Sequence, residues 1–188
     1  MSVFIARNPS KGFTLLEMMI VLMLAGIMAA IATPSFLAMN NNSKITDAVE
    51  QTQGALQEAQ TQAMRKSQSC SVKLVKIGQK INTTDTTSVT TPVLRGNPPS
   101  CLITGDRTLT GIVLDHNVTA NSNNNQAPLE ITFDYKGRTN AITTDQKVFF
   151  SVLNTPGTAK CITISKGIGL FRIGKKSGTD DCNTTQLN

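Results

Sequence analysis

The feature that most constrains this chain is an apolar run of 27 residues, from Phe13 to Met39, that holds a single carboxylate, Glu17. A helix rises about 1.5 Å per residue, so a run of this length exceeds the ~30 Å hydrocarbon thickness of a bilayer. Arg7 and Lys11 precede the run. The positive-inside bias would keep them in the cytoplasm and place everything after residue 39 on the other side of the membrane.

The residues alone leave two interpretations of this run open. An ordinary secretory signal has its charges before the apolar run and its small-residue cleavage site after it. Here the Lys11-Gly12 pair precedes the run, and no clear cleavage site follows. The segment is therefore either a simple single-pass anchor or a helix that is cleaved on its cytoplasmic side.

Hydropathy divides the 188 residues into four segments. Residues 1–12 form a short basic leader, and residues 13–39 form the apolar run. In residues 40–69 apolar side chains recur at intervals of four and seven, the helical period. We therefore expect one helix from about residue 13 to about residue 69, bent or loosened near Pro34. The residues that carry the period are Ile45, Val49, Leu56 and Ala63, with Ala48, Ala55 and Ala59 beside them.

Residues 70–188 have the period of two that is typical of β-strands. The alternation is clearest from Leu129 to Tyr135, and Lys136-Gly137 then predicts a tight turn into residues 139–143. The predicted fold is α+β and pilin-like, a long N-terminal helix with a transmembrane first half, packed on an antiparallel sheet. Other strands are predicted at 72–74, 148–153, 161–165 and 169–173, a turn at 154–157, and loops at 82–91 and 117–127.

The four cysteines predict disulfides rather than a metal site. They contain no C-x-x-C pair, and His116 is the only histidine. We expect Cys161 to pair with Cys182, and Cys70 with Cys101, in an oxidising compartment. Four unpaired buried thiols remain the alternative. We expect His116 to be an ordinary surface residue in a loop, because no nucleophile motif accompanies it. The sequence therefore predicts no enzymatic activity, no cofactor and no metal.

Glu17 is the most informative single residue. A carboxylate within a bilayer helix costs about 2.5–3.5 kcal/mol on insertion scales. If cleavage followed Gly12, the new α-ammonium of Phe13 on a neighbouring subunit would be a charge partner for Glu17 and would set the register between packed helices. Alternatively, Glu17 lies near enough to the membrane edge to reach water.

The run Lys11-Gly12-Phe13-Thr14-Leu15-Leu16-Glu17 resembles the prepilin peptidase site of type IV pilins and type II secretion pseudopilins. Gly26 and Pro34 fall where this family commonly has a glycine and a helix-loosening proline. The resemblance implies cleavage between Gly12 and Phe13, N-methylation of Phe13, and a role for Glu17 in subunit recruitment and assembly. It implies as partners the prepilin peptidase, other subunits and the inner membrane, with the C-terminal domain in the periplasm or on an extracellular filament.

A second resemblance narrows the family. Residues 45–68 are similar to the second half of the first helix in GspH/FimT minor pilins and pseudopilins. Residues 131–138 resemble their strand-and-turn motif, and residues 161–172 their C-terminal strands. The implied function is that of a minor subunit of a type IV pilus or a secretion pseudopilus. Residues 78–128 resemble no family.

A basic C-terminal run offers a second function, DNA capture during natural transformation. Its cations could contact phosphates, and some FimT-like proteins are thought to use a Gly-Arg-x-Arg element near this place. Here Leu170 replaces the first arginine. A solvated basic edge that protects a terminal strand is the alternative, and a plain membrane-anchored domain is a third. The candidate DNA-binding residues are Lys166, Arg172, Lys175 and Lys176, beside Lys160.

Overall fold

The fold is α+β, as the sequence predicts, with a long helix packed onto antiparallel sheets. The computed structural model describes residues 12–81, 86–116, 128–139, 142, 144–153, 159–178 and 181–185, without the side chains of 30–35. Helix α1 (Leu15–Lys66) runs without a break through Pro34. The chain separates into two units, Met1–Asn40 and Asn41–Asn188, and each is described by itself.

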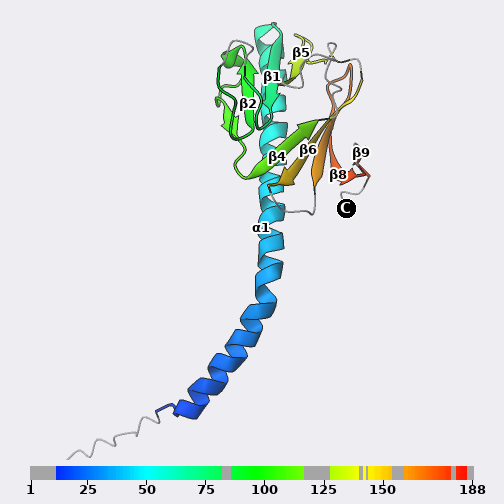
Figure 1. Cartoon of the computed structure of the whole chain (residues 1–188). Helices are drawn as coiled ribbons and strands as arrows, with labels where there is room; N and C mark the ends of the chain where they lie inside the picture. Colours follow the sequence, from blue (N-terminus) through cyan, green and yellow to red (C-terminus); the bar gives the residue numbers. More distant parts are fainter. Residues whose placement is uncertain are drawn as a thin grey trace, which may run out of the picture. The chain divides into compact units, whose positions relative to one another are not determined.

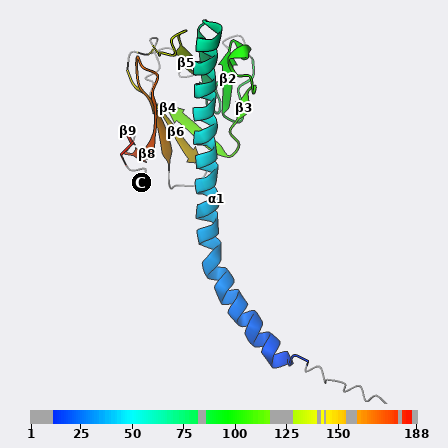
Figure 2. The same cartoon turned by 180° about the vertical axis from the view of Figure 1, so that it is seen from behind.

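In the second unit, the nine strands that the structure describes form two sheets instead of the single sheet expected. The first sheet has the order β3-β2-β1-β5 and the second the order β4-β6-β7-β8-β9, and all pairs are antiparallel. Figures 1 and 2, seen from opposite sides, show β2 on one side of the second half of α1 and β6 and β8 on the other. The strands are β1 (Cys70–Val75), β2 (Val93–Asn97), β3 (Arg107–Thr108), β4 (Ile112–His116), β5 (Leu129–Phe133), β6 (Gln146–Val152), β7 (Lys160–Ile164), β8 (Phe171–Ser177) and β9 (Asp181–Asn183), with a short 3-10 helix η1 (Pro99–Cys101).

The core lies between the second half of α1 and the two sheets. The predicted helical stripe is confirmed, because all seven of its members are buried. Four of them are alanines, which let the strands approach the helix backbone closely. Thr52 is also buried, and its hydroxyl donates a hydrogen bond to the carbonyl oxygen of Ala48 at 2.8 Å. Among the described residues, the core cluster is aliphatic apart from Phe133, Phe150 and the disulfide-bonded Cys70 and Cys101.

Gly54 lies in the middle of α1 because a side chain packs across it. The Arg107 guanidinium donates to the carbonyl oxygen of Gln51 at 2.7 Å and to a carboxylate oxygen of Glu58 at 2.8 Å. A Cβ on Gly54 would stand 3.1 Å from Nη1 of Arg107. Gly54 weakens the helix locally, but it makes room for the Arg107 guanidinium, which connects β3 to α1.

The C-terminus of α1 closes in a Schellman motif. The N–H of Gln68 donates to the carbonyl oxygen of Ala63 at 3.2 Å, and that of Ser67 to Met64 at 3.4 Å. Ser67 has φ 51°, in the left-handed region that usually belongs to glycine at this position. The helix therefore ends before Cys70, where β1 begins.

Both predicted cysteine pairs are present as disulfides. Cys70 and Cys101 join the start of β1 to η1, with Cα atoms 5.5 Å apart. Cys161 of β7 and Cys182 of β9 are linked across β8, with Cα atoms 5.9 Å apart. Gly174 of β8 permits this crossing, because a Cβ there would clash with the carbonyl oxygen of Asn183 and stand 3.1 Å from Sγ of Cys182.

Several strand predictions need correction. β5 ends at Phe133, and Tyr135, predicted as an inward strand residue, lies in the following turn and is 56% exposed. No strand follows that turn at Thr139 or Ile142, the two residues of the predicted segment that the structure describes. Strands β2, β3, β4 and β9 were not predicted. The predicted loop at 117–127 and turn at 154–157 lie outside the described residues, and residues 86–91 of the other loop form bends.

Candidate processing and assembly site

The helix begins two residues after the predicted scissile bond. Gly12, Phe13 and Thr14 are not helical, and α1 starts at Leu15. The Thr14 hydroxyl accepts a hydrogen bond from the N–H of Glu17 at 3.2 Å, which makes Thr14 the N-cap. The spacing Thr-x-x-Glu is the capping-box signature, a signal that could have been read from the sequence. The Gly12–Phe13 bond therefore lies in a non-helical segment ahead of a capped helix.

Both residues beside this bond are open. Apart from Gly12 itself and its chain neighbours, no heavy atom of the described residues lies within 4 Å of a Cβ built on Gly12. The Phe13 side chain is 78% exposed. A protease that binds an extended backbone could therefore reach the bond without unfolding any described part of the chain.

The first unit presents apolar side chains on all sides of its helix. Burying one large aliphatic side chain is worth about 1.5–3 kcal/mol, so this surface needs apolar surroundings. The exposed residues include Leu15, Leu16, Met18, Met19, Ile20, Val21, Leu22, Met23, Leu24, Ile27, Met28, Phe36, Leu37 and Met39.

Among the described residues, no helix meets the length and hydropathy that a membrane-spanning helix requires.

Glu17 lies in the first turn of α1 and is exposed in the single chain. A carboxylate in this turn interacts favourably with the partial positive charge of the helix N-terminus. Its backbone N–H is already used by Thr14.

Comparison with protein families identifies this segment. Residues 7–33 match the family model of the prokaryotic N-terminal methylation motif. With this match, the N-terminal segment fits the pilin and pseudopilin superfamily. The match contains Gly12, Phe13 and Glu17, whereas residues 7–11 lie outside the described part of the structure. Searches against curated proteins and against solved structures gave no significant match.

The structure does not gather the C-terminal cations on one face. Along β8, Arg172 and Lys176 point to the outer face of the sheet and Lys175 to the opposite face, because side chains alternate along a strand. Lys175 is directly opposite Lys160, whose ammonium donates to the Thr46 hydroxyl at 2.8 Å. The strand therefore divides between its two faces the basic run that was the candidate for DNA binding.

Two turns from the segments that resemble GspH/FimT proteins meet on the helix. Gln60 donates a hydrogen bond from Nε2 to the carbonyl oxygen of Gly137 at 2.7 Å. Gly169, with φ 67°, packs against the same place, since a Cβ there would stand 2.8 Å from that carbonyl oxygen. Thr139 is buried between the turns and donates to the Ser165 carbonyl oxygen at 3.0 Å. These two sequence segments thus build one packed corner.

His116 is not the surface loop residue that the sequence predicts. It ends β4 opposite Val148, and its ring nitrogens are buried without a hydrogen-bond partner among the described residues. Burial, followed by the nearby Lys76 ammonium, lowers the pKa of His116 to about 4. Lys76 pairs with Asp115 at 3.0 Å and so connects the end of β1 to β4.

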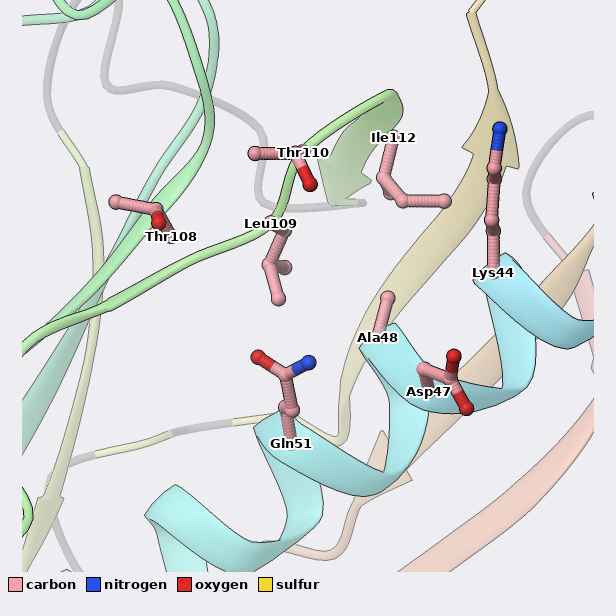
Figure 3. A pocket seen from close by; sticks show the side chains of 8 residues that line it. All are labelled: Lys44, Asp47, Ala48, Gln51, Thr108, Leu109, Thr110 and Ile112. Atoms are coloured by element: carbon pink, nitrogen blue, oxygen red, sulfur yellow. The ribbon is translucent and has the colours of Figure 1, made fainter.

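A pocket of about 110 Å³ lies between α1 and the connection from β3 to β4. Figure 3 shows Ala48 and Gln51 of α1 directed towards Leu109, with Lys44 and Asp47 at one end. The rest of the lining is Thr108, Thr110 and Ile112. In the described part of the chain, no group of three histidine, cysteine or acidic side chains could hold a metal ion.

Proposed function

We propose that this chain is a minor pilin or pseudopilin of the GspH/FimT kind, a structural subunit of a type IV pilus or a type II secretion pseudopilus. The observation that carries the proposal is the N-terminal methylation motif at residues 7–33, followed by a helix with an exposed apolar surface. The non-helical Gly12–Thr14 segment supports it, because a peptidase could act there without unwinding the helix.

In this proposal the apolar helix has two successive environments. Before assembly it anchors the subunit in the inner membrane as a single span, with residues 70–188 in the periplasm. Cleavage after Gly12 then frees the amine of Phe13, which is methylated. In the filament the helix packs among those of other subunits, and Glu17 pairs with a neighbouring N-terminus. The two disulfides support a domain outside the cytoplasm.

Mass spectrometry of the chain produced with and without a prepilin peptidase tests the proposal. We expect the peptidase to remove residues 1–12 and the mature N-terminus to carry one methyl group. Gly12→Val should block cleavage, because the peptidase needs close approach to the backbone before the scissile bond. The substitution should leave the domain unaltered, because the space around Gly12 is open. Glu17→Gln should be cleaved normally but fail to enter filaments. An intact Met1 beside the active peptidase would reject this function and favour a plain membrane anchor.

DNA capture in the manner of FimT is the second candidate. One observation favours it: among the described residues, no carboxylate lies within ion-pair distance of Lys166, Arg172, Lys175 or Lys176. Leu170 in place of an arginine and the division of these cations by the strand argue against it. Gel-shift titration of the mature chain with double-stranded DNA decides the question, since phosphate binding should be strongest at low salt. Absence of any shift there would reject it.

A further inference from the structure

In the second sheet, β8 is paired with the terminal strand β9 along only part of its length. β8 has seven residues, but β9 pairs only with Lys175, Lys176 and Ser177. Among the described residues, no strand pairs with Phe171–Gly174 on that side. An uncovered strand edge presents backbone N–H and C=O groups to which another chain can pair.

The C-terminal strap, defined as Asp181–Thr185, ends the covered part of β8. The Cys161–Cys182 disulfide and the ion pair between Lys147 and Asp181, at 2.9 Å, hold the strap in place. Beyond Asn183, Thr184 and Thr185 leave the strand pairing. The described strap therefore covers Gly174, where Asn183 packs against it, and stops short of the edge at Phe171–Ile173.

The cations around this edge suit a strand added in the plane of the sheet. Arg172, Lys175 and Lys176 are exposed and point to both faces of β8, and Lys166 is exposed in the preceding turn. A polyanion such as DNA that lies along one face of the sheet would contact only some of these cations. An added strand would itself carry side chains on both faces, so acidic residues on it could meet cations on each.

A groove continues from this edge towards the helix. It has a volume of about 460 Å³ and is lined by three glutamines of α1 and by the turn before β8. Ile168 and Leu170 in that turn are exposed, Ile168 by 67%. Amides can bond an extended backbone, and the two aliphatic residues can pack against its apolar side chains. The lining residues are Gln53, Gln57, Gln60, Ile168, Gly169, Leu170 and Phe171.

We propose that the edge of β8 at Phe171–Ile173 binds an acidic, extended segment of a partner protein as an added β-strand. Backbone hydrogen bonds to β8 hold this segment, and Arg172 and Lys175 select its acidic side chains. The inference goes beyond the role of a pilus or pseudopilus subunit, because it gives the chemistry of a partner. It does not depend on cleavage after Gly12.

Fluorescence anisotropy of a labelled peptide with the full chain in detergent micelles tests this inference. The probe is a short peptide of alternating acidic and valine residues, and its control is the same peptide with alternate backbone amides N-methylated. We expect the first peptide to bind, with affinity that falls as salt rises, and the N-methylated peptide not to bind. Hydrogen exchange at Phe171–Ile173 should slow when the first peptide is bound.

Paired charge-reversal variants distinguish peptide binding at the β8 edge from non-specific attraction of an acidic peptide to a basic protein. Arg172→Glu with Lys175→Glu should weaken peptide binding about tenfold or more. Lys44→Glu with Lys136→Glu makes the same change in net charge at exposed sites elsewhere and should have little effect.

Three results would overturn the inference: equal binding of the N-methylated peptide, equal weakening by both variant pairs, or no binding of the first peptide at low salt. Binding of a short DNA duplex in place of the peptide would likewise overturn it and assign the cations to nucleic acid.

Discussion

Replacing Gly174 with alanine should destabilise the C-terminal domain, because the strap passes directly over this position. The added Cβ would clash with the carbonyl oxygen of Asn183 and stand 2.8 Å from its carbonyl carbon. Both are backbone atoms, so no side-chain rotation relieves the contact. Sγ of Cys182, 3.1 Å from the Cβ position, belongs to a disulfide and has little freedom to move.

The expected cost is that of overpacking a well-packed site, about 1–3 kcal/mol. The Cys161–Cys182 disulfide determines how much of this destabilisation is observed. With Cys161 joined to Cys182, the strap cannot leave β8, so the strain remains in the folded state. Without the disulfide, β9 is held by only three residue pairs and the Lys147–Asp181 ion pair, and it can move away. Gly174→Ala should then cost less than about 0.5 kcal/mol beyond the loss of the disulfide, itself worth about 3 kcal/mol for a loop of this length.

Pulse proteolysis across a urea series, with the full chain in detergent, measures the four free energies of unfolding. They belong to the parent chain, Gly174→Ala, the Cys161→Ser/Cys182→Ser double variant and the combination. The reasoning predicts strong non-additivity, with most of the cost of alanine disappearing in the absence of the disulfide. An equal cost in both backgrounds, or none in the parent, would refute it.

Three further measurements test other parts of the structure. Ser67→Gly should stabilise the domain by about 0.5–1 kcal/mol in urea unfolding, because glycine adopts the left-handed conformation without strain; destabilisation would contradict the helix end described here. Arg107→Met should lower stability by about 2–3 kcal/mol, since it leaves the carboxylate of Glu58 without its cation. Burial raises the pKa of Glu58, but hydrogen bonds from Thr104 and the charge of Arg107 lower it below its usual value, so this contribution is present above about pH 4.5 and should disappear in acid. His116, with its pKa lowered to about 4 from 6.5, should reduce stability as pH falls between these values, because the unfolded chain binds the proton first; a flat profile, or one unchanged in His116→Gln, would contradict its burial.

Local patterns predicted the elements whose side chains repeat with a clear period. The stripe from Ile45 to Ala63 and the alternation from Leu129 to Phe133 each follow from one buried face. β2 and β3 have no such pattern, because β2 contains Arg95 and Gly96 and β3 is only two residues long. Their existence depends on pairing with β1 and on the contacts of Arg107 with the helix.

The N-terminal methylation motif could be recognised from the sequence. Its signal is local: a glycine, an apolar run with one carboxylate, and a threonine three residues before that carboxylate. The basic run near the C-terminus was harder to interpret. Only the strand register reveals that Arg172 and Lys175 face opposite ways.

The sequence by itself determined what its local chemistry encodes: the apolar helix with Glu17, the motif around Gly12, the buried stripe of α1 and the α+β class. Only the tertiary structure decided that the strands form two sheets, that Gly54 makes room for Arg107, and that the strap stops partway along β8. The physical reason is range. Periodicity and capping act over a few residues, whereas strand order and the passage of one backbone across another depend on groups that are far apart in the chain.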